Sequence, residues 1–181
     1  KKPIKSTYLI HRANFVACHN PAYMTKFNMV QELVDGGTFL LNCVWNKDEI
    51  AEHIPGQVKK YMYDHKINFY IINGVKIGIE TGMGPTRINT ILQSAFFTLT
   101  GIIPKEDANK LMKDAAQKTY GRKGEDVVKK NWAAIDAGAN AFEKIEIPED
   151  WANAQDEGLE FKDKTEGAKD VLDFVNNIQN K

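Results

Sequence analysis

This sequence contains few cysteines, and neither its cysteines nor its histidines show the spacing of a metal site. Only two cysteines are present, Cys18 and Cys43, and they form no CxxC pair, so neither a zinc site nor an iron–sulfur cluster is expected in this chain. The four histidines, at positions 11, 19, 53 and 65, show no HxxxH or HExxH spacing, so no metal site is predicted. We interpret both cysteines as buried free thiols of a reducing cytosol rather than as a disulfide.

An excess of charge and long apolar runs are also missing. Lys and Arg together number 24, as do Asp and Glu, so the formal net charge is zero. A nucleic-acid partner, which would call for a basic excess, is therefore not expected. No apolar run approaches the roughly 20 residues that span a bilayer, and no signal-peptide apolar region follows the basic start. The sequence predicts a cytoplasmic protein, and the lack of an initiator Met suggests that it begins within a longer polypeptide.

What the sequence does contain, over 181 residues, is an alternation of strands and helices. Short apolar runs bounded by polar residues at 15–18, 38–41 and 68–72 predict strands buried on both faces. Between the strands we expect a helix over 21–34 that ends at a Gly36-Gly37 C-cap, a short helix opened by an Asn46/Glu49 capping box, and a helix from Pro55 to about Asp64. Such an order predicts a parallel sheet.

The second half of the chain is predicted to be helical, over 76–80, 87–99, 104–120 and 124–142. Residues 143–170 then hold ten acidic and four basic side chains, which predicts an acidic linker over 143–163 and a marginal helix over 165–178. We divide the chain into an α/β domain, residues 1–147, and an acidic linker with its terminal helix, residues 148–181.

The fold class predicted is α/β, with a partial Rossmann-like parallel sheet, flanking helices and a helical C-terminal part. A doubly wound fold normally has five or six strands, so we expect the missing strands upstream of Lys1. Their absence would leave an unpaired sheet edge at Phe15–Cys18 or at Thr38–Leu41.

Two groups of residues are candidates for ligand binding. Asn20 and Asn42 each follow a buried strand, where ligands bind in open α/β sheets; alternatively, each amide bonds to its own loop backbone. Glycines and an arginine precede the helix predicted over 87–99, an arrangement that suits an anion at a helix start. The alternative is a tight interhelical turn. The candidates here are Gly82, Gly84, Arg87 and Asn89.

Several other residues could suggest catalysis or ligand binding, but we interpret them as structural. The neighbouring carboxylates Asp48-Glu49 and Glu106-Asp107 do not face each other on a helix, so we do not expect them to be catalytic. His11 and His19 have no carboxylate partner nearby in sequence, which favours a structural role over titration near neutral pH. The tryptophans at 45, 132 and 151 are interpreted as packing or interdomain anchors.

Six segments in unbroken order over roughly residues 1–150 resemble one known family. They are Lys2–Ile10, Phe15–Asn20, Gly36–Asn42, Arg87–Phe97, Lys118–Glu125 and Asn131–Gly138. Together they resemble the third domain of pyruvate:ferredoxin (flavodoxin) oxidoreductase, which is equivalent to the gamma subunit of the multi-chain 2-oxoacid:ferredoxin oxidoreductases.

The resemblance implies a function that belongs to a larger enzyme. Members of the family convert pyruvate and coenzyme A to acetyl-CoA and carbon dioxide with thiamine diphosphate and magnesium, and pass electrons through [4Fe-4S] clusters to ferredoxin or flavodoxin. It implies further that the remaining domains of the same polypeptide are partners, that the whole enzyme is a homodimer, and that the third domain helps to enclose coenzyme A.

Three functions remain open at this stage. The chain is a domain of the oxidoreductase that is inactive alone, or a free-standing nucleotide or small-molecule binding module, or a structural spacer without ligand contact. No residue is expected to be catalytic. If a ligand site exists, we expect an anionic group, such as a coenzyme A phosphate, at the carboxyl ends of the three strands.

Overall fold

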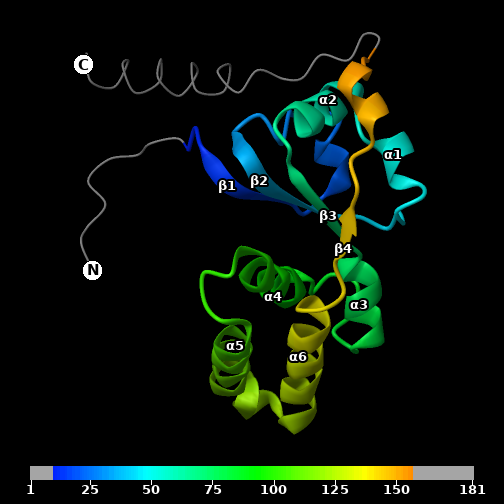
Figure 1. The fold of residues 1–181 in the computed structure, drawn as a ribbon. Helices are drawn as coiled ribbons and strands as arrows, with labels where there is room; N and C mark the ends of the chain where they lie inside the picture. Colours follow the sequence, from blue (N-terminus) through cyan, green and yellow to red (C-terminus); the bar gives the residue numbers. More distant parts are fainter. Residues whose placement is uncertain (1–9, 157–181) are drawn as a thin grey trace, which may run out of the picture.

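The computed structural model describes residues 10–156, and its core is a sheet with strand order β1-β2-β3-β4 (Figure 1). The strands are β1 (Ala13–Cys18), β2 (Leu33–Asn42), β3 (Asn68–Ile72) and β4 (Glu143–Ile145). The first three are parallel, which confirms the predicted parallel sheet. Strand β4 runs antiparallel to β3 and was not foreseen. Among the described residues β1 pairs only with β2, so of the two expected edges Phe15–Cys18 is the outer one.

Helices cover both faces of the sheet. The first half of the chain contributes η1 (Pro21–Tyr23), α1 (Ile50–His53) and α2 (Gly56–Asp64). The second half contributes α3 (Gly74–Glu80), α4 (Asn89–Thr100), α5 (Lys105–Tyr120), η2 (Gly121–Lys123), α6 (Glu125–Gly138) and η3 (Glu149–Asn153). Every helix predicted between residues 46 and 142 is present within a few residues of its predicted ends. The predicted helix over 165–178 lies outside the described residues.

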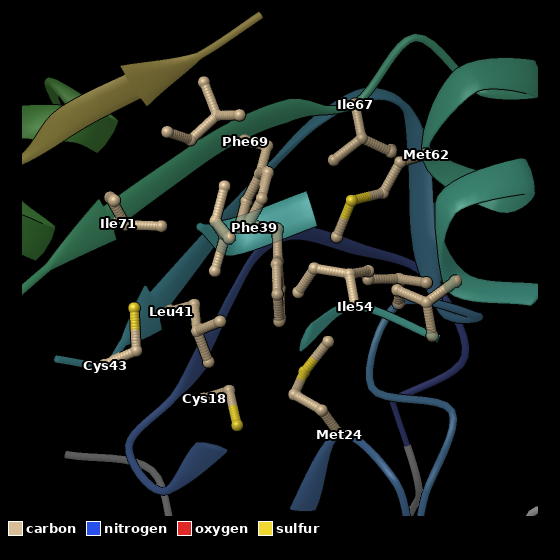
Figure 2. Close-up of a cluster of buried hydrophobic side chains, with 14 of the residues drawn as sticks. Cys18, Met24, Phe39, Leu41, Cys43, Ile54, Met62, Ile67, Phe69 and Ile71 are labelled. Atoms are coloured by element: carbon tan, nitrogen blue, oxygen red, sulfur yellow. The ribbon is translucent and has the colours of Figure 1, made fainter. Parts of the chain in front are cut away.

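Alternate residues of the central strands pack into two separate cores. Phe39, Leu41 and Phe69 join α1, α2 and Trp151 on one face, and Figure 2 shows these three strand side chains within the cluster. Leu40 and Ile72 point to the other face and pack on α3, α4 and α6. Because both faces are buried, the strands are apolar throughout, which is why short apolar runs predicted them correctly.

The predicted helix over 21–34 is wrong. After the single turn η1 the chain runs through bends, and Leu33 already belongs to β2. The Asn20 side chain accepts a hydrogen bond from Ala22 N, and the Asn28 side chain accepts one from Val30 N. These local bonds favour turns over a continuous helix. Met24, Val30 and Leu33 are nevertheless buried, so their helix-like spacing reflected burial rather than a helix.

Gly36 and Gly37 are not a helix C-cap, because both lie inside β2. The register with β1 shifts between the Ala13–Leu33 pair and the Phe15–Thr38 pair, so β2 contains an irregular stretch here. Gly36 has a φ of 71°, and a Cβ atom on Gly37 would lie 2.8 Å from the Val34 carbonyl oxygen. The two glycines therefore allow a bulge in the strand.

The acidic linker predicted from residue 143 is also wrong for the described part of that segment. Residues 143–145 form β4, and η3 places Trp151 in the core with 4% of its surface exposed. Asp156 accepts hydrogen bonds from Gly56 N at 2.7 Å and Gln57 N at 2.9 Å, at the start of α2. The prediction relied on the acidic composition of the segment and overlooked its three apolar residues that pack on the core, namely Ile145, Ile147 and Trp151.

Candidate functional site

The carboxyl ends of the three parallel strands are tied together by Asn42. This residue ends β2 and is 6% exposed. Its Nδ2 donates to the His19 carbonyl oxygen at 2.9 Å, just beyond β1, and its Oδ1 accepts from Gly74 N at 2.9 Å, at the start of α3. Both ends of the amide are thus engaged within the protein, and Asn42 holds the shape of this rim.

Asn20 lies on the same rim and serves its own loop. Its Oδ1 accepts from Ala22 N at 3.0 Å, and its carbonyl oxygen accepts from the Cys18 thiol at 3.1 Å. The side chain is exposed, so it remains accessible from solvent. His19, between Asn20 and β1, is exposed as well and contributes its backbone oxygen to Asn42.

The glycine turn before α4 packs against α3. Gly82 and Gly84 have φ values of 73° and 87°, in the region that favours glycine. Gly84 N donates to the Gly78 carbonyl oxygen at 2.8 Å, and a Cβ atom on Gly74 would lie 3.3 Å from the Ile88 Cβ. The turn therefore reaches the rim at Gly74, beside Asn42.

Arg87 and Asn89, however, line a separate cavity of about 350 Å³. Both side chains are exposed. The other lining residues come from the turn, the start of α4, the end of α5, η2 and α6: Met83, Thr86, Thr90, Tyr120, Lys123, Val127 and Asn131. Neither Asn20 nor Asn42 lines it. The structure thus divides the predicted candidates into a rim group and a cavity group that meet through Gly74 and Ile88.

A second cavity of about 340 Å³ lies between α4, α5 and α6. Its lining is mostly apolar and includes Phe97, Ile103, Leu111 and Met112. It shares Thr90, Tyr120 and Asn131 with the first cavity, so the two adjoin. Leu111 of α5 lines this cavity and is 57% exposed.

Asn131 is the residue at this junction that sequence reasoning missed. It is 2% exposed, and its Nδ2 donates to the Val127 carbonyl oxygen at 2.8 Å. Its Oδ1 is the one buried side-chain polar atom in residues 10–156 without a hydrogen-bond partner in the protein. The available signal was its position on α6, three residues after Val128 and four before Ile135, where an apolar residue is expected.

The electrostatics of the two cavities favour anions. Arg87 and Lys123 line the first cavity, and no Asp or Glu lines either one. Lys123 Nζ lies 5.5 Å from the centre of the Tyr120 ring, which orients the cation beside the cavity. An anion entering here would meet two cations and the amino end of the 12-residue helix α4.

The cysteines offer no nucleophile at neutral pH. Both are buried and free, as predicted. Burial raises the pKa of Cys18 to about 11, against the weaker opposing effect of the hydrogen bond to Asn20. Burial likewise raises the pKa of Cys43 to about 11. Both thiols therefore stay protonated near neutral pH, and thiolate chemistry is not expected.

The remaining sequence candidates have structural partners. Asn46 and Glu49 form the predicted capping box: Asn46 Oδ1 accepts from Asp48 N at 2.8 Å, and Glu49 Oε2 accepts from Asn46 N at 3.3 Å. Trp45 stacks on His53 with the ring centres 4.0 Å apart. Trp132 Nε1 donates to the Lys113 carbonyl oxygen. Glu106 and Asp107 lie in the first turn of α5, as the helix dipole favours.

A polar hollow at the amino ends of the strands was not predicted from sequence. His65 Nδ1 lies 2.6 Å from an Asp35 carboxylate oxygen, and the His65 ring stacks on Tyr61. His11 lines the same hollow. Within residues 10–156 no three His, Cys, Asp or Glu side chains gather as a metal site would require. No helix in that range is both long and apolar enough to cross a membrane.

Comparison with known proteins gives a consistent set of relatives. The family described as pyruvate ferredoxin/flavodoxin oxidoreductase matches residues 1–141. A pyruvate:ferredoxin oxidoreductase of Moorella thermoacetica is 43% identical over 157 residues, which cover 87% of this chain and 13% of the relative. A pyruvate-flavodoxin oxidoreductase of Enterobacter agglomerans is 39% identical over 170 residues, which cover 94% of this chain and 14% of the relative.

A solved structure shares the fold. The pyruvate oxidoreductase subunit PORC of Thermotoga maritima superposes with a TM-score of 0.58 at 16% identity, over 76% of this chain and 67% of that chain. The chain described here thus spans about one seventh of the length of its bacterial relatives, in a region that folds like a subunit of a multi-chain enzyme.

Proposed function

Because this chain belongs to the pyruvate ferredoxin/flavodoxin oxidoreductase family, we propose that it acts as the gamma-type α/β domain of an enzyme that converts pyruvate and coenzyme A to acetyl-CoA and carbon dioxide. The match of the family over residues 1–141 carries this proposal. The fold that this chain shares with the PORC subunit supports its assignment as the gamma-type domain. Within the proposal, residues 1–147 form this domain, and the segment after them packs back onto it through Trp151 and Asp156.

The residues of this chain do not fit the redox cofactors of such an enzyme. A [4Fe-4S] cluster takes four cysteine thiolates, and the sequence holds two cysteines. We therefore assign the clusters to the remaining domains of the polypeptide. We assign thiamine diphosphate and magnesium there as well, since no three His, Cys, Asp or Glu side chains gather within residues 10–156, and we assign no catalytic residue here. Electron transfer to ferredoxin or flavodoxin, a homodimeric enzyme and a cytoplasmic location belong to the same proposal. The names of the relatives include both electron carriers.

The part of coenzyme A chemistry that this domain can serve is binding. We place the coenzyme A-facing surface at Asn20, Gly82, Gly84, Arg87 and Asn89, and the buried Asn42 holds the backbone of this rim in position. Arg87 supports this assignment most directly, because it is exposed and lines a cavity that contains a second cation and no carboxylate. One arginine–phosphate contact contributes about 1.5–3 kcal/mol, so the isolated chain should bind with a Kd of about 1 mM or weaker.

A coenzyme A titration followed by NMR tests this assignment. We expect shifts at Arg87 and Asn89 and at the backbone of Gly82 and Gly84. The variant Arg87→Ala should abolish the shifts and leave the melting temperature nearly unchanged, because the side chain is exposed. The variant Arg122→Ala is the matched control, since Arg122 lies in η2 and lines neither cavity. If millimolar coenzyme A perturbs none of these residues, the domain is a structural spacer.

A further inference from the structure

The connection from β3 into α3 is made by Asn73 and Gly74, the one Asn-Gly dipeptide in the sequence. An asparagine before glycine is chemically labile, because glycine has no Cβ atom to hinder attack by its own backbone nitrogen on the asparagine side chain. The hydrogen bonds of this connection determine whether that attack can occur in the folded protein.

The fold calls for both residues of the dipeptide. Asn73 is the N-cap of α3, and its Oδ1 accepts a hydrogen bond from Lys76 N at 2.9 Å. Gly74 is buried, and a Cβ atom there would lie 2.9 Å from Asn42 Oδ1 and 3.3 Å from Ile88 Cβ. Asparagine therefore suits the cap and glycine fits the close approach, so the labile pair follows from the way β3 joins α3.

The Gly74 nitrogen, the atom that would react, is held by Asn42. Its N–H donates to Asn42 Oδ1 at 2.9 Å, and both groups are buried. The Asn42 amide is fixed in turn, because its Nδ2 donates to the His19 carbonyl oxygen at 2.9 Å. Attack on Asn73 requires Gly74 N to give up its proton and leave Asn42, which would strand a buried acceptor without a donor.

The Asn73 amide is held at its other end by α3. Its side-chain oxygen accepts from Lys76 N, and its backbone carbonyl oxygen accepts from Ile77 N at 3.1 Å. Ring closure onto Gly74 N would turn the side chain away from Lys76 and displace the peptide that bonds to Ile77. The first turn of α3 must therefore open before the reaction can proceed.

We propose that Asn73 is a deamidation site of this protein and that Asn42 sets its rate by holding the Gly74 N–H. In the reaction Gly74 N forms a bond to Asn73 Cγ, and the bond from Cγ to the amide nitrogen breaks. Ammonia leaves with the proton that Gly74 N gives up, and a succinimide ring remains. Water then opens the ring to aspartate or isoaspartate, so no reactant other than water is needed.

The two products change the connection differently. Aspartate keeps the backbone and adds a negative charge at the start of α3, where the free N–H groups of the helix tolerate it. Isoaspartate carries the main chain through Cβ and Cγ, which lengthens the link between β3 and α3 and moves Gly74 relative to Asn42. We therefore expect the isoaspartate form to melt at a lower temperature. The inference needs neither a ligand nor the rest of the enzyme.

Incubation of the 181-residue chain at mildly alkaline pH, followed by peptide mass spectrometry and enzymatic detection of isoaspartate, tests the site. We expect Asn73 to react at least about tenfold faster in the urea-unfolded chain than in the folded chain, because unfolding removes the hydrogen bond to Gly74 N. Asn73→Gln is the control for assignment, since its longer side chain closes the ring more slowly and should leave the position unmodified.

Variants of Asn42 test how the rate is controlled. Asn42→Ala removes the acceptor of Gly74 N and should speed the reaction in the folded chain by about tenfold. Asn42→Asp is the matched control, because it keeps an acceptor for Gly74 N while losing the donor to His19, so Asn73 should stay slow. Asp156→Ala removes a contact at the start of α2 and controls for a general loss of stability.

Each result decides a separate part of the proposal. Absence of conversion at Asn73 in the unfolded chain would overturn the modification site, and equal rates in the folded and unfolded chain would overturn its protection. A rate in Asn42→Ala no higher than in Asn42→Asp or Asp156→Ala would overturn the role of Asn42. If Asn42→Ala does not fold, Asn42→Ser takes its place, since its shorter side chain cannot bridge His19 and Gly74.

Discussion

The Asn42 side chain joins the ends of two strands and the start of a helix. It donates to His19 beyond β1 and accepts from Gly74 at α3, and it is buried. Sequence placed Asn42 correctly at a strand end but left open whether the amide serves a ligand or its surroundings. Its direct contacts within the protein are structural, and any effect on a ligand at this rim would act through the positions of these backbone segments.

We predict that Asn42→Ala lowers the free energy of unfolding by about 2–4 kcal/mol, because it leaves a buried N–H and a carbonyl oxygen without their partner. Urea denaturation of the chain measures this loss. Asn20→Ala is the control: its side chain is exposed and caps only a three-residue turn, so it should cost about 1 kcal/mol or less. Equal losses for the two variants would contradict the role given to Asn42.

Asp136 shows how a surface contact links α5 and α6. Lys113 Nζ lies 2.7 Å and Asn109 Nδ2 2.9 Å from its carboxylate oxygens. Burial alone would raise the pKa of Asp136, but the hydrogen bonds from Lys113 and Asn109 outweigh it and hold the pKa below its ordinary value. A lowered pKa stabilises the fold above the ordinary aspartate range and loses that effect in acid, although the 52% exposure of this side chain keeps the contribution small.

At the scale of elements, the start of α2 depends on a residue 100 positions away in sequence. The helix begins after Pro55 without a side-chain cap of its own. Asp156 supplies the cap through both carboxylate oxygens, to Gly56 N and Gln57 N. A Cβ atom on Gly56 would collide with the backbone of Gln155, so the glycine lets the two segments approach. The contact fastens the segment after η3 to α2.

We predict that Asp156→Ala lowers the free energy of unfolding by about 1–2 kcal/mol, since two helix N–H groups lose a charged acceptor. Asp156→Asn should cost less, because one oxygen remains. Hydrogen exchange at Gly56 and Gln57 reports the effect locally and should speed up in the alanine variant. The control is Glu146→Ala, an exposed acid of the same segment. Unchanged exchange in Asp156→Ala would show that the cap contributes nothing.

The accuracy of sequence reasoning differed from one element to the next for physical reasons. The strands β1–β3 were predictable because burial on both faces leaves unbroken apolar runs. The capping box of Asn46 and Glu49 was predictable because it is local in sequence. Strand β4 was missed because its three residues, Glu-Lys-Ile, contain a single apolar side chain and pair only through β3. The false helix at 21–34 arose because turn residues can be buried at helical spacing.

In the candidate site, too, the features that are local in sequence were predictable and those that depend on tertiary packing were not. The conformations that only glycine adopts easily, at Gly82 and Gly84, and the exposed Arg87 before a helix could be read from neighbouring residues. The cavities could not, because they depend on how α5 packs against α4 and α6. Asn131 acquires its meaning only through that packing, which brings Thr90 of α4 and Tyr120 of α5 to the same lining.

At the scale of the whole molecule, the two thiols are protonated at neutral pH, and no three His, Cys, Asp or Glu side chains gather between residues 10 and 156 as a metal site would require. The features that remain are cations, glycine turns and cavities, which serve binding and domain contact. In the function proposed above, catalysis is assigned to the rest of the polypeptide, since the matched region covers only 13% and 14% of the length of the two bacterial relatives.

We predict that the isolated chain shows no pyruvate-dependent reduction of a viologen dye and no release of carbon dioxide, even with added thiamine diphosphate, magnesium and coenzyme A. The reason is that two buried thiols cannot ligate a cluster that needs four. The whole enzyme assayed in parallel is the positive control. In that enzyme, Arg87→Ala should raise the KM for coenzyme A by about tenfold or more, while the KM for pyruvate stays within about twofold. Turnover by the pure chain would contradict the assignment of catalysis to the other domains. An unchanged KM for coenzyme A would indicate that this domain is a structural spacer without a role in coenzyme A binding.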